Sequence, residues 1–396
     1  MSDKYFKARQ EFEWKRNTQW KGIPQDDGNG NKLYLIYAVI EDNPNEIGLR
    51  VNGDSVVNWG DGNSETTNGG TYTNVYHVYD YATVTGTILT LDDGRNYKNV
   101  LIDLTYTTSG TSPEYLFYIW YNSSSSYSGS NNILECVSYL GDGVSINGPG
   151  SAKHLFGLYS YSTIVEHISI KTPSNSDYSQ TSQFRYCKQL KKLELPDGYF
   201  HTGTYLLYTF WAASLYGHNF GDIHVNRFNN AFRYIDNAHF GDIIVDSSML
   251  NDFIHANNYS IKSITALNNT NGYYLFGGTV NNGANSIGLI DMPLLEDVRY
   301  MFRRSQMPEV VFTDCSNFTV NDSMFYDCYA IQKLIMPGLI IGVDVNDSNL
   351  TADAIDAFFT SVGTASGAQT LDVSDNPGSA TCDTTIATTK GWTVIT

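Results

Sequence analysis

FRYCKQLKKLELP at residues 184–196 and FYDCYAIQKLIMP at residues 325–337 are two copies of one sequence pattern. Both fit F-x-x-C-x-x-(L/I)-x-K-L-x-(L/M)-P, although they start 141 residues apart. Shorter shifts recur between them, since HNFGDIHV at 218–225 returns as AHFGDIIV at 238–245. Self-similarity with a period of 20 to 50 residues is the signature of stacked repeats. The sequence therefore predicts a solenoid over this part of the chain.

Short β-forming triplets mark the predicted units, about 20 to 30 residues apart. They are Ile168–Ile170, Leu193–Leu195, Ile223–Val225, Ile243–Val245, Ile264–Ala266, Leu289–Ile290, Val310–Phe312 and Leu334–Met336. A single unit cannot bury its own apolar face, so the units must stack and share a core. The predicted core residues are Phe184, Cys187, Leu190, Leu193, Leu195, Phe325, Cys328, Ile331, Leu334 and Met336. We expect Cys187 and Cys328 to be small buried hydrophobes, with a redox role as the weaker alternative.

The combined pattern MFxxCxxLxxLxLP resembles the BspA-like leucine-rich repeats of bacterial surface antigens and phage structural proteins. It is clearest at 184–196 and 324–337, with looser copies at 154–173, 210–225, 232–246 and 300–312. The resemblance implies degenerate leucine-rich repeats over residues 131–346. Their exact number is open, because the copies are weakly conserved among themselves.

Residues 347–396 predict a small α/β unit that caps the solenoid. Thr351 can cap a helix whose apolar residues recur at helical spacing, namely Leu350, Ala354, Ile355, Phe358 and Phe359. A strand at 371–373, a short helix near 382–390 and a closing strand at 392–395 follow. The N-P-G-x-x-x-C turn and the K-G-W-T-V ending are similar to the ends of many phage-encoded proteins with such repeats. A solenoid needs a terminal unit of this kind to cover its last apolar face.

Residues 31–130 predict an all-β module ahead of the repeats. LYLIYAVIED (33–42) indicates a buried strand, and IGLRVNGD (47–54) alternates so that Ile47, Leu49 and Val51 share one face. The order strand, WGDG, strand, HxYxYA resembles the polycystic-kidney-disease (PKD) type of immunoglobulin-like module. The matching residues are Trp59, Gly60, Asp61, Gly62, His77, Tyr79 and Tyr81. The resemblance implies a seven-stranded β-sandwich, although Gly86-Thr87-Ile88 replaces the usual Gly-x-Tyr of the last strand.

Asp54 and Asp61 of this module allow two interpretations. A carboxylate beside a tight Gly turn usually bonds the backbone of that turn, and we favour this role. Cation binding by the two aspartates is the alternative. His77 is expected to pack on its strand and not to bind a metal.

Residues 1–30 form a predicted N-terminal arm with a charge opposite to the rest of the chain. Residues 1–22 hold six basic side chains against three acidic ones, whereas the whole chain carries a net charge of −17. The arm is either a solvated tail or an anchor that docks on a partner surface, and its many large aromatics favour the anchor. The residues predicted to anchor it are Tyr5, Phe6, Phe12, Trp14, Lys15, Arg16 and Trp20.

The composition limits the partners of the chain. A net charge of −17 argues against nucleic acid, which needs a basic face. The five cysteines are scattered without a CxxC pair, so we predict no disulfide framework, no metal site and no cofactor. Neither a signal-peptide core nor a membrane span is visible in the sequence, which predicts synthesis in a host cytoplasm without membrane insertion. The 29 tyrosines suit adhesion, because Tyr offers a large contact area at low entropic cost.

These features together resemble a virion structural protein of a tailed phage of the marine type. The resemblance implies a non-enzymatic tail fibre or host-surface adhesin located in the virion. A capsid decoration or head-fibre protein is the alternative. The implied partners are other virion proteins (capsid, tail or portal-proximal), a host-surface glycan or protein, and further copies of the chain in a homo-oligomer. A polysaccharide-cleaving solenoid is a third hypothesis, since Asp222 and Asp242 lie at equivalent repeat positions, although recurring Asp residues are more simply turn residues.

Overall fold

A computed structural model of the chain describes residues 14–25, 31–43, 45–51, 54–68, 73–107, 117–119, 132–139, 164–170, 179–181, 184, 187–195, 200, 205–249, 253, 256, 259–278 and 284–396. The chain divides into two compact units. The first unit comprises Met1–Ser176, Ser182–Tyr199 and Ala213–His218, and the second comprises Asp177–Thr181, Phe200–Ala212 and Asn219–Thr396. The described part is mainly β, with helices only near the C-terminus.

The first unit contains two β-sheets. The described strands are β1 (Asn31–Ile40), β2 (Asn45–Val51), β3 (Asp54–Asn58), β4 (Ser64–Thr67), β5 (Thr73–Tyr79), β6 (Leu89–Thr90), β7 (Asn96–Thr107), β8 (Phe117–Ile119), β9 (Ile133–Tyr139), β10 (His167–Ile170) and β12 (Lys192–Glu194). One sheet has the order β12-β10-β9-β1-β7-β3-β4, with β6 paired to β7, and the other has the order β5-β2-β8. The two sheets contact each other where Tyr37 of β1 stacks on Tyr79 of β5, with ring centroids 5.3 Å apart.

Strand β1 is buried on both faces, which explains its nearly continuous apolar sequence. Tyr37 faces the second sheet, and its hydroxyl donates to the Glu46 carbonyl on β2. Ile36, Ala38 and Ile40 project to the other face, where they form one apolar cluster with Trp20. The buried strand predicted at 33–42 is therefore present, except that Glu41 and Asp42 belong to the turn that follows β1.

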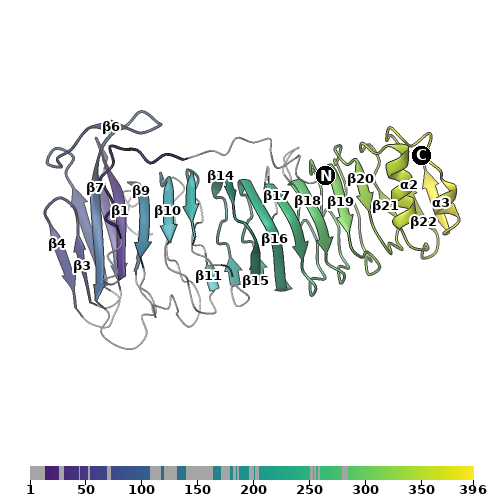
Figure 1. The fold of residues 1–396 in the computed structure, drawn as a ribbon, viewed down its shortest axis with the longest axis horizontal. Helices are drawn as coiled ribbons and strands as arrows, with labels where there is room; N and C mark the ends of the chain where they lie inside the picture. The colour runs from purple at the N-terminus through teal and green to yellow at the C-terminus, as the bar shows by residue number, and fades with distance from the viewer. Residues whose placement is uncertain are drawn as a thin grey trace. The chain divides into compact units, whose positions relative to one another are not determined.

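The second unit contains a β-solenoid of about eight turns. Its strands follow the order β11 (Ser179–Thr181), β13 (Tyr205–Leu207), β15 (Ile223–Asn229), β16 (Asp236–Ser248), β17 (Tyr259–Thr265), β18 (Ala284–Asp291), β19 (Glu309–Phe312) and β20 (Lys333–Ile335) in one sheet. The strand β14 (Ser214–Asn219) belongs to the first unit up to His218. Successive strands from β15 to β20 pair in parallel and lie side by side (Figure 1). The predicted triplets align, because Ile243 pairs with Ile264, Ile264 with Ile290, and Ile290 with Phe312.

A column of phenylalanines runs through the core of the solenoid, one from each turn. We call Phe210, Phe232, Phe253, Phe276, Phe302 and Phe325 the phenylalanine ladder. Neighbouring rings of the ladder lie 5.2 to 5.9 Å apart, and all six are at most 3 % exposed. Offset-stacked aromatic pairs add about 0.5–1.5 kcal/mol each beyond the area that they bury. The ladder thus fixes the register of one turn on the next.

The return segments also stack through backbone hydrogen bonds. Phe276 N donates to Met301 O at 2.9 Å, and Phe302 N donates to Met324 O at 3.0 Å. The residue two positions before the ladder Phe has a positive φ at five turns, as at Tyr274 (57°) and Tyr300 (56°). This conformation costs non-glycine residues on the order of 1–2 kcal/mol. It recurs because the stacked neighbours impose it.

A small α/β unit caps the C-terminal end of the solenoid. It contains β21 (Val343–Asp344), α2 (Ala352–Ser361), β22 (Gln369–Asp372), α3 (Thr385–Thr388) and β23 (Trp392–Ile395), and the three strands are parallel. The helix α2 begins after Thr351, whose Oγ1 accepts a hydrogen bond from Ala354 N. Lys390 Nζ donates to the carbonyls of Phe359, Thr360 and Val362 at the other end of α2. Lys390 of the K-G-W ending therefore closes the C-terminal end of α2.

Asn376 and Gly378 fix the N-P-G turn of the cap through contacts with neighbouring segments. Asn376 is 5 % exposed, and its Nδ2 donates to the carbonyls of Val345 and Val373. A Cβ on Gly378 would lie 2.0 Å from Ala352 N, so only glycine lets the turn approach the first residue of α2.

The strands near the predicted start of the repeats pair with the sheet of the first unit. β9 pairs antiparallel with β1, and β10 and β12 extend the same sheet through parallel pairs. The predicted start of the repeats at residue 131 stays a prediction. Among the residues that the structure describes, no helix is long and apolar enough to cross a membrane.

Candidate functional site

The candidate binding surface lies on the outer corners of the solenoid, next to the phenylalanine ladder. At four turns the residue that follows the ladder Phe is half-buried or exposed, and its side chain is either aromatic or cationic. These residues are Trp211, Arg233, Arg303 and Tyr326. The ladder Phe before each of them is buried, so its backbone position is set by the core. The solenoid therefore holds these corner side chains on a rigid scaffold.

Arg303 lies among three tyrosine rings. Its Cζ is 5.6 Å from the ring centroids of Tyr274 and Tyr300, and 5.4 Å from that of Tyr326. Arg303 Nη1 donates a hydrogen bond to the Tyr274 hydroxyl. Its Nε is buried and has no hydrogen-bond partner among the described residues. Tyr326 is 52 % exposed, so solvent reaches one side of this group, which we call the Arg303 cluster.

Gly277 makes room for the Arg303 cluster. A Cβ at this position would lie 2.6 Å from Cδ1 of Tyr274 and 3.3 Å from the Tyr300 carbonyl oxygen. Real Cβ atoms do not approach other atoms to 2.6 Å, so any side chain at 277 would push the Tyr274 ring away. Glycine at this corner is therefore required for the ring to lie beside Arg303.

Arg233 occupies the equivalent position three turns earlier. Its Cζ is 5.1 Å from the ring centroid of Trp211 and 4.9 Å from that of Tyr234. Arg233 Nη1 donates to Asn230 Oδ1, and Nη2 donates to the Tyr234 hydroxyl. Its Nε is also buried without a partner among the described residues. We call Arg233, Trp211, Tyr234 and Asn230 the Arg233 cluster.

Most other described arginines are neutralised by a carboxylate. The pairs are Arg16 with Glu135, Arg95 with Asp93, Arg299 with Asp297, and Arg304 with Asp327. Arg233 and Arg303 have no carboxylate within ion-pair distance among the described residues. Both belong to the same repeat position, and aromatic rings surround both.

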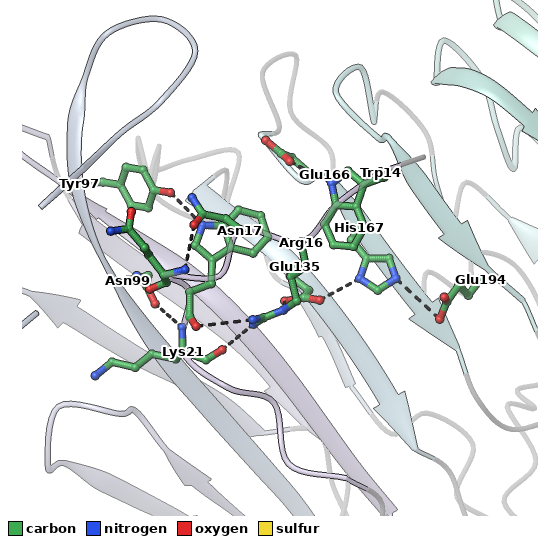
Figure 2. A network of polar contacts seen from close by, with 12 residues as sticks. Trp14, Arg16, Asn17, Lys21, Tyr97, Asn99, Glu135, Glu166, His167 and Glu194 are labelled. Carbon is green, nitrogen blue, oxygen red and sulfur yellow. Dashed lines mark hydrogen bonds and ion pairs between the residues drawn. The ribbon is translucent and has the colours of Figure 1, made fainter. Parts of the chain in front are cut away.

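The N-terminal arm packs on the chain's own first unit (Figure 2). Trp20 is 6 % exposed, and its Nε1 donates to the Tyr97 hydroxyl at 2.9 Å. Arg16 Nε donates to Glu135 Oε2 at 2.7 Å, and Trp14 Nε1 donates to Glu166 Oε2 at 3.1 Å. These predicted anchor residues thus have hydrogen-bond partners within the chain, and Trp20 covers the face of β1 that carries Ile36, Ala38 and Ile40. That they also dock on a partner surface stays a prediction.

The other four predicted anchor residues are Lys15, Tyr5, Phe6 and Phe12. Lys15 is exposed on the described part of the arm. Tyr5, Phe6 and Phe12 lie outside the described residues. An anchoring role on another protein is thus a prediction that rests on these three aromatics.

His167 joins two glutamates beneath the arm. Its Nδ1 lies 2.8 Å from Glu135 Oε1, its Nε2 lies 3.7 Å from Glu194 Oε2, and Trp14 packs on its ring at 4.6 Å. Burial by itself would lower the pKa of His167, but the contacts with Glu135 and Glu194 raise the pKa above its ordinary value of 6.5. Glu135 is 2 % exposed and receives both Arg16 and His167, which offset the cost of burying its charge.

The WGDG and HxY residues of the first unit come together. His77 stacks on Trp59 at 5.0 Å, and its Nε2 lies 2.7 Å from Asp61 Oδ2. The Tyr79 hydroxyl donates to the Trp59 carbonyl. Burial by itself would raise the pKa of Asp61, but hydrogen bonds from Asn63 and His77 lower it. Asp61 thus bonds the backbone of its turn, as Asn63 N donates to Asp61 Oδ1.

Glycine and tyrosine complete this motif. A Cβ on Gly60 (φ 80°) would lie 2.2 Å from the Leu101 carbonyl oxygen, whereas the same atom on Gly62 (φ 100°) would meet open space. Tyr81 packs under Lys98, whose Nζ is 4.5 Å from the ring centroid. Asp54, the other predicted cation-binding candidate, lies at the start of β3. No group of three or more His, Cys, Asp or Glu side chains suited to a metal ion occurs in the described ranges.

The predicted core residues of the repeats all belong to the described residues. Phe184, Cys187, Leu190, Leu193, Phe325, Cys328, Ile331, Leu334 and Met336 are at most 4 % exposed. Leu195 differs from these residues, because it follows the end of β12 and is half-buried. Its counterpart Met336 is buried, since α2 packs against β20 next to it. Burial raises the pKa of the Cys328 thiol to about 12, and this thiol donates to the Phe302 carbonyl. All five cysteines are free.

The recurring Asp residues hold the turns of the solenoid. Asp222 Oδ1 accepts a hydrogen bond from Asp242 N at 2.8 Å. Asp242 in turn contacts Lys262 Nζ and Ser263 Oγ, both at 2.6 Å. Each of these two carboxylates therefore accepts hydrogen bonds from the following turn and links neighbouring turns of the solenoid.

Sequence reasoning missed the two arginine clusters. The dipeptide Phe-Arg recurs at 184–185, 232–233 and 302–303, and this spacing is the signal that could have identified them. The first of these arginines lies outside the described residues. No protein family, curated protein or solved structure matches the chain. Its own geometry carries the functional argument.

Proposed function

We propose that this chain is a non-enzymatic structural protein of a phage virion, and that its solenoid is the adhesive part of a tail fibre or appendage. The observation that carries the proposal is the pair of arginine clusters on the outer corners of the solenoid. Each presents a guanidinium and aromatic rings from a backbone fixed by the buried ladder. Sites on rigid elements lose little entropy on binding, which suits an attachment surface.

The finer fold assignments belong to this proposal. The contacts among Trp59, Asp61, His77 and Tyr79 support a PKD-like, immunoglobulin-type assignment for the sandwich. The ladder and the one short strand in each turn support a BspA-like, leucine-rich assignment for the repeats. The cap, with its N-P-G turn and its K-G-W ending, supports the phage resemblance.

Within this proposal the arm has two parts. Residues 14–25 fasten the arm to the first unit through Trp20, Arg16 and Trp14. Residues 1–13, with Tyr5, Phe6 and Phe12, would then contact other virion proteins such as capsid, tail or portal-proximal subunits. Further copies of the chain are the other proposed partners, in a homo-oligomer.

The non-enzymatic part of the proposal is supported by the roles of the recurring carboxylates. A glycoside hydrolase needs two carboxyl groups on either side of a sugar bond. Asp222 and Asp242 are instead engaged with the backbone and side chains of the next turn. Incubating the purified chain with host polysaccharide and measuring released reducing ends tests this part. Release above that of an Asp242→Asn variant would contradict it.

Antibody labelling of purified particles, viewed by electron microscopy, tests the location. The proposal expects label at the tail or at an appendage. Label spread over the shell in many copies would instead support the capsid decoration alternative. Particles that carry no label would contradict a virion role altogether. Deleting residues 1–13 is expected to abolish incorporation while leaving the thermal stability of the purified chain unchanged, because residues 14–25 keep their contacts.

A further inference from the structure

We propose that the Arg303 cluster and the Arg233 cluster are binding sites for isolated acidic sugar residues of an otherwise neutral glycan. The inference rests on the proposed adhesive function and names the ligand class. It concerns the second unit alone, where both clusters lie. Three features support it, namely the hydrogen-bonding capacity of the guanidiniums, the aromatic rings beside them, and the charge of the chain.

The first step is the hydrogen-bonding capacity. A guanidinium has five N–H donors in a fixed planar fork, and this fork matches a carboxylate, sulfate or phosphate group. Among the described residues, the Arg303 side chain makes one hydrogen bond, to the Tyr274 hydroxyl. Its neighbour Arg304 has a carboxylate partner in Asp327, and Arg299 has one in Asp297. Arg303 is therefore the cation of this corner whose counter-ion remains to be supplied.

The second step is the set of rings. Tyr300 and Tyr326 lie with Tyr274 around the guanidinium, and Tyr326 is 52 % exposed. A sugar has an apolar face of C–H groups that packs on an aromatic ring, while its polar groups reach donors at the ring's edge. A ring beside an unpaired guanidinium thus provides both contacts that an acidic sugar needs. The glycine at 277 and the left-handed backbone of Tyr274 and Tyr300 hold this geometry in place.

The third step is the net charge, which decides which acidic ligand fits. A chain of net charge −17 repels a uniformly charged polyanion at long range. At ~0.15 M ionic strength the screening length is about 8 Å. A single acidic group close to Arg303 therefore interacts mainly with that cation and little with the distant acidic residues. The surface therefore selects separated acidic residues and disfavours a continuous polyanion.

The two clusters lie three turns apart in the repeat. Neighbouring strands are ~4.8 Å apart, which places the clusters roughly 15 Å from each other along the stack. A glycan with acidic residues at about this distance can occupy both clusters at once. Simultaneous binding raises the overall affinity, because the second contact becomes intramolecular.

The experiment uses the purified full chain on an array of matched glycan pairs. Each pair differs only in one acidic group, as in a uronic acid against its parent hexose, a sialylated glycan against its asialo form, and a sulfated sugar against the unsulfated one. The acidic member that binds best is then titrated by calorimetry against the wild type and variants. Arg303→Gln removes the charge, and Arg303→Lys keeps the charge without the fork. Lys333→Gln is the matched control, because Lys333 is an exposed cation of the same unit paired with Glu309.

The proposal expects the wild type to prefer acidic members at least ~10-fold, as one charge-assisted contact provides. Arg303→Gln should lose ~10-fold or more, Arg303→Lys should lie between, and Lys333→Gln should bind as the wild type does. The Arg233→Gln, Arg303→Gln double variant should lose more than either single variant. Thermal melting of each variant within about 2 °C of the wild type shows that the fold is intact.

Five other outcomes would overturn the inference. Equal binding of acidic and neutral members shows a neutral glycan site, and unchanged binding by Arg303→Gln shows a site elsewhere. Tighter binding of polygalacturonate than of a singly acidic oligosaccharide at ~50 mM salt contradicts the role of the net charge. Absence of any glycan binding while the chain still adheres to host cells shows a protein receptor, and the proposed adhesive function then stands without this ligand. Absence of both kinds of binding removes the adhesive function as well.

Discussion

Replacing Phe302 by alanine is the most informative test of the solenoid core. The side chain is 0 % exposed and stacks on Phe276 at 5.6 Å and on Phe325 at 5.5 Å. It also meets Phe312 edge-on at 5.9 Å. Burial loss and the resulting cavity put the cost of Phe302→Ala at about 3–5 kcal/mol. Phe302→Leu keeps most of the apolar volume but loses the ring pairs, so about 1–2 kcal/mol is expected.

Hydrogen exchange followed by mass spectrometry on the full chain suits this test. Repeat arrays open locally, so one global unfolding free energy can mislead for such a chain. Peptides from residues 276–325 should lose protection in Phe302→Ala, while peptides from β1 and β7 keep theirs. Leu294→Ala is the control, because Leu294 is 44 % exposed and surface changes usually cost within ~0.5 kcal/mol. A loss below about 1 kcal/mol for Phe302→Ala, or equal losses for Phe302→Ala and Leu294→Ala, would refute a stacked core.

Three further predictions concern the first unit. Gly60→Ala should lower the free energy of unfolding in urea by more than ~2 kcal/mol, because its Cβ would lie 2.2 Å from the Leu101 carbonyl oxygen. Gly62→Ala, whose Cβ meets open space, should cost only the ~1 kcal/mol of its positive φ. Equal costs for the two variants would contradict the close approach at Gly60. Trp20→Ala should lower the free energy of unfolding by about 3–5 kcal/mol and expose the arm to trypsin at Lys21. Gln19→Ala, the control, should leave the cleavage rate unchanged. Unaltered cleavage of Trp20→Ala would show that Trp20 does not hold the arm. The raised pKa of His167 predicts stability that is fully present below pH 6.5 and is lost as the pH rises from 6.5 through the raised pKa, because the folded state holds the proton more tightly than the unfolded state. Thermal melts of the wild type and His167→Gln across pH 5 to 9 check this, and an identical pH dependence of the two proteins would contradict it.

The repeats were predictable from the sequence because their signal is local and recurs. The triplets at 243–245 and 310–312 lie on β16 and β19, and the triplet at 264–266 begins on β17 and ends one residue after it. Their pairing is the one expected of stacked turns. The cap was predictable for the same reason, since Thr351 and the apolar stripe of α2 are neighbours in sequence. The burial of Leu33 to Ile40 followed from their composition alone.

Other features depend on contacts between residues far apart in sequence. Nothing in residues 14–20 shows that Trp20 reaches Tyr97, 77 residues away. The pairing of β9 with β1 likewise joins strands that are far apart in the sequence. The Arg303 cluster needed the turn stack, because Tyr274, Arg303 and Tyr326 come from three different turns. The sequence identified the aromatics but could not show which ones share a corner.

The central claim is that the arginine corners of the solenoid attach the virion to its host. The most direct test measures adsorption of labelled particles to host cells in the presence of purified chain. The wild-type chain should compete with the particles and lower their adsorption in proportion to its concentration. The Arg233→Gln, Arg303→Gln double variant should compete poorly at the same concentration, while Lys333→Gln competes as the wild type does. Equal competition by the double variant and the wild type would contradict the claim.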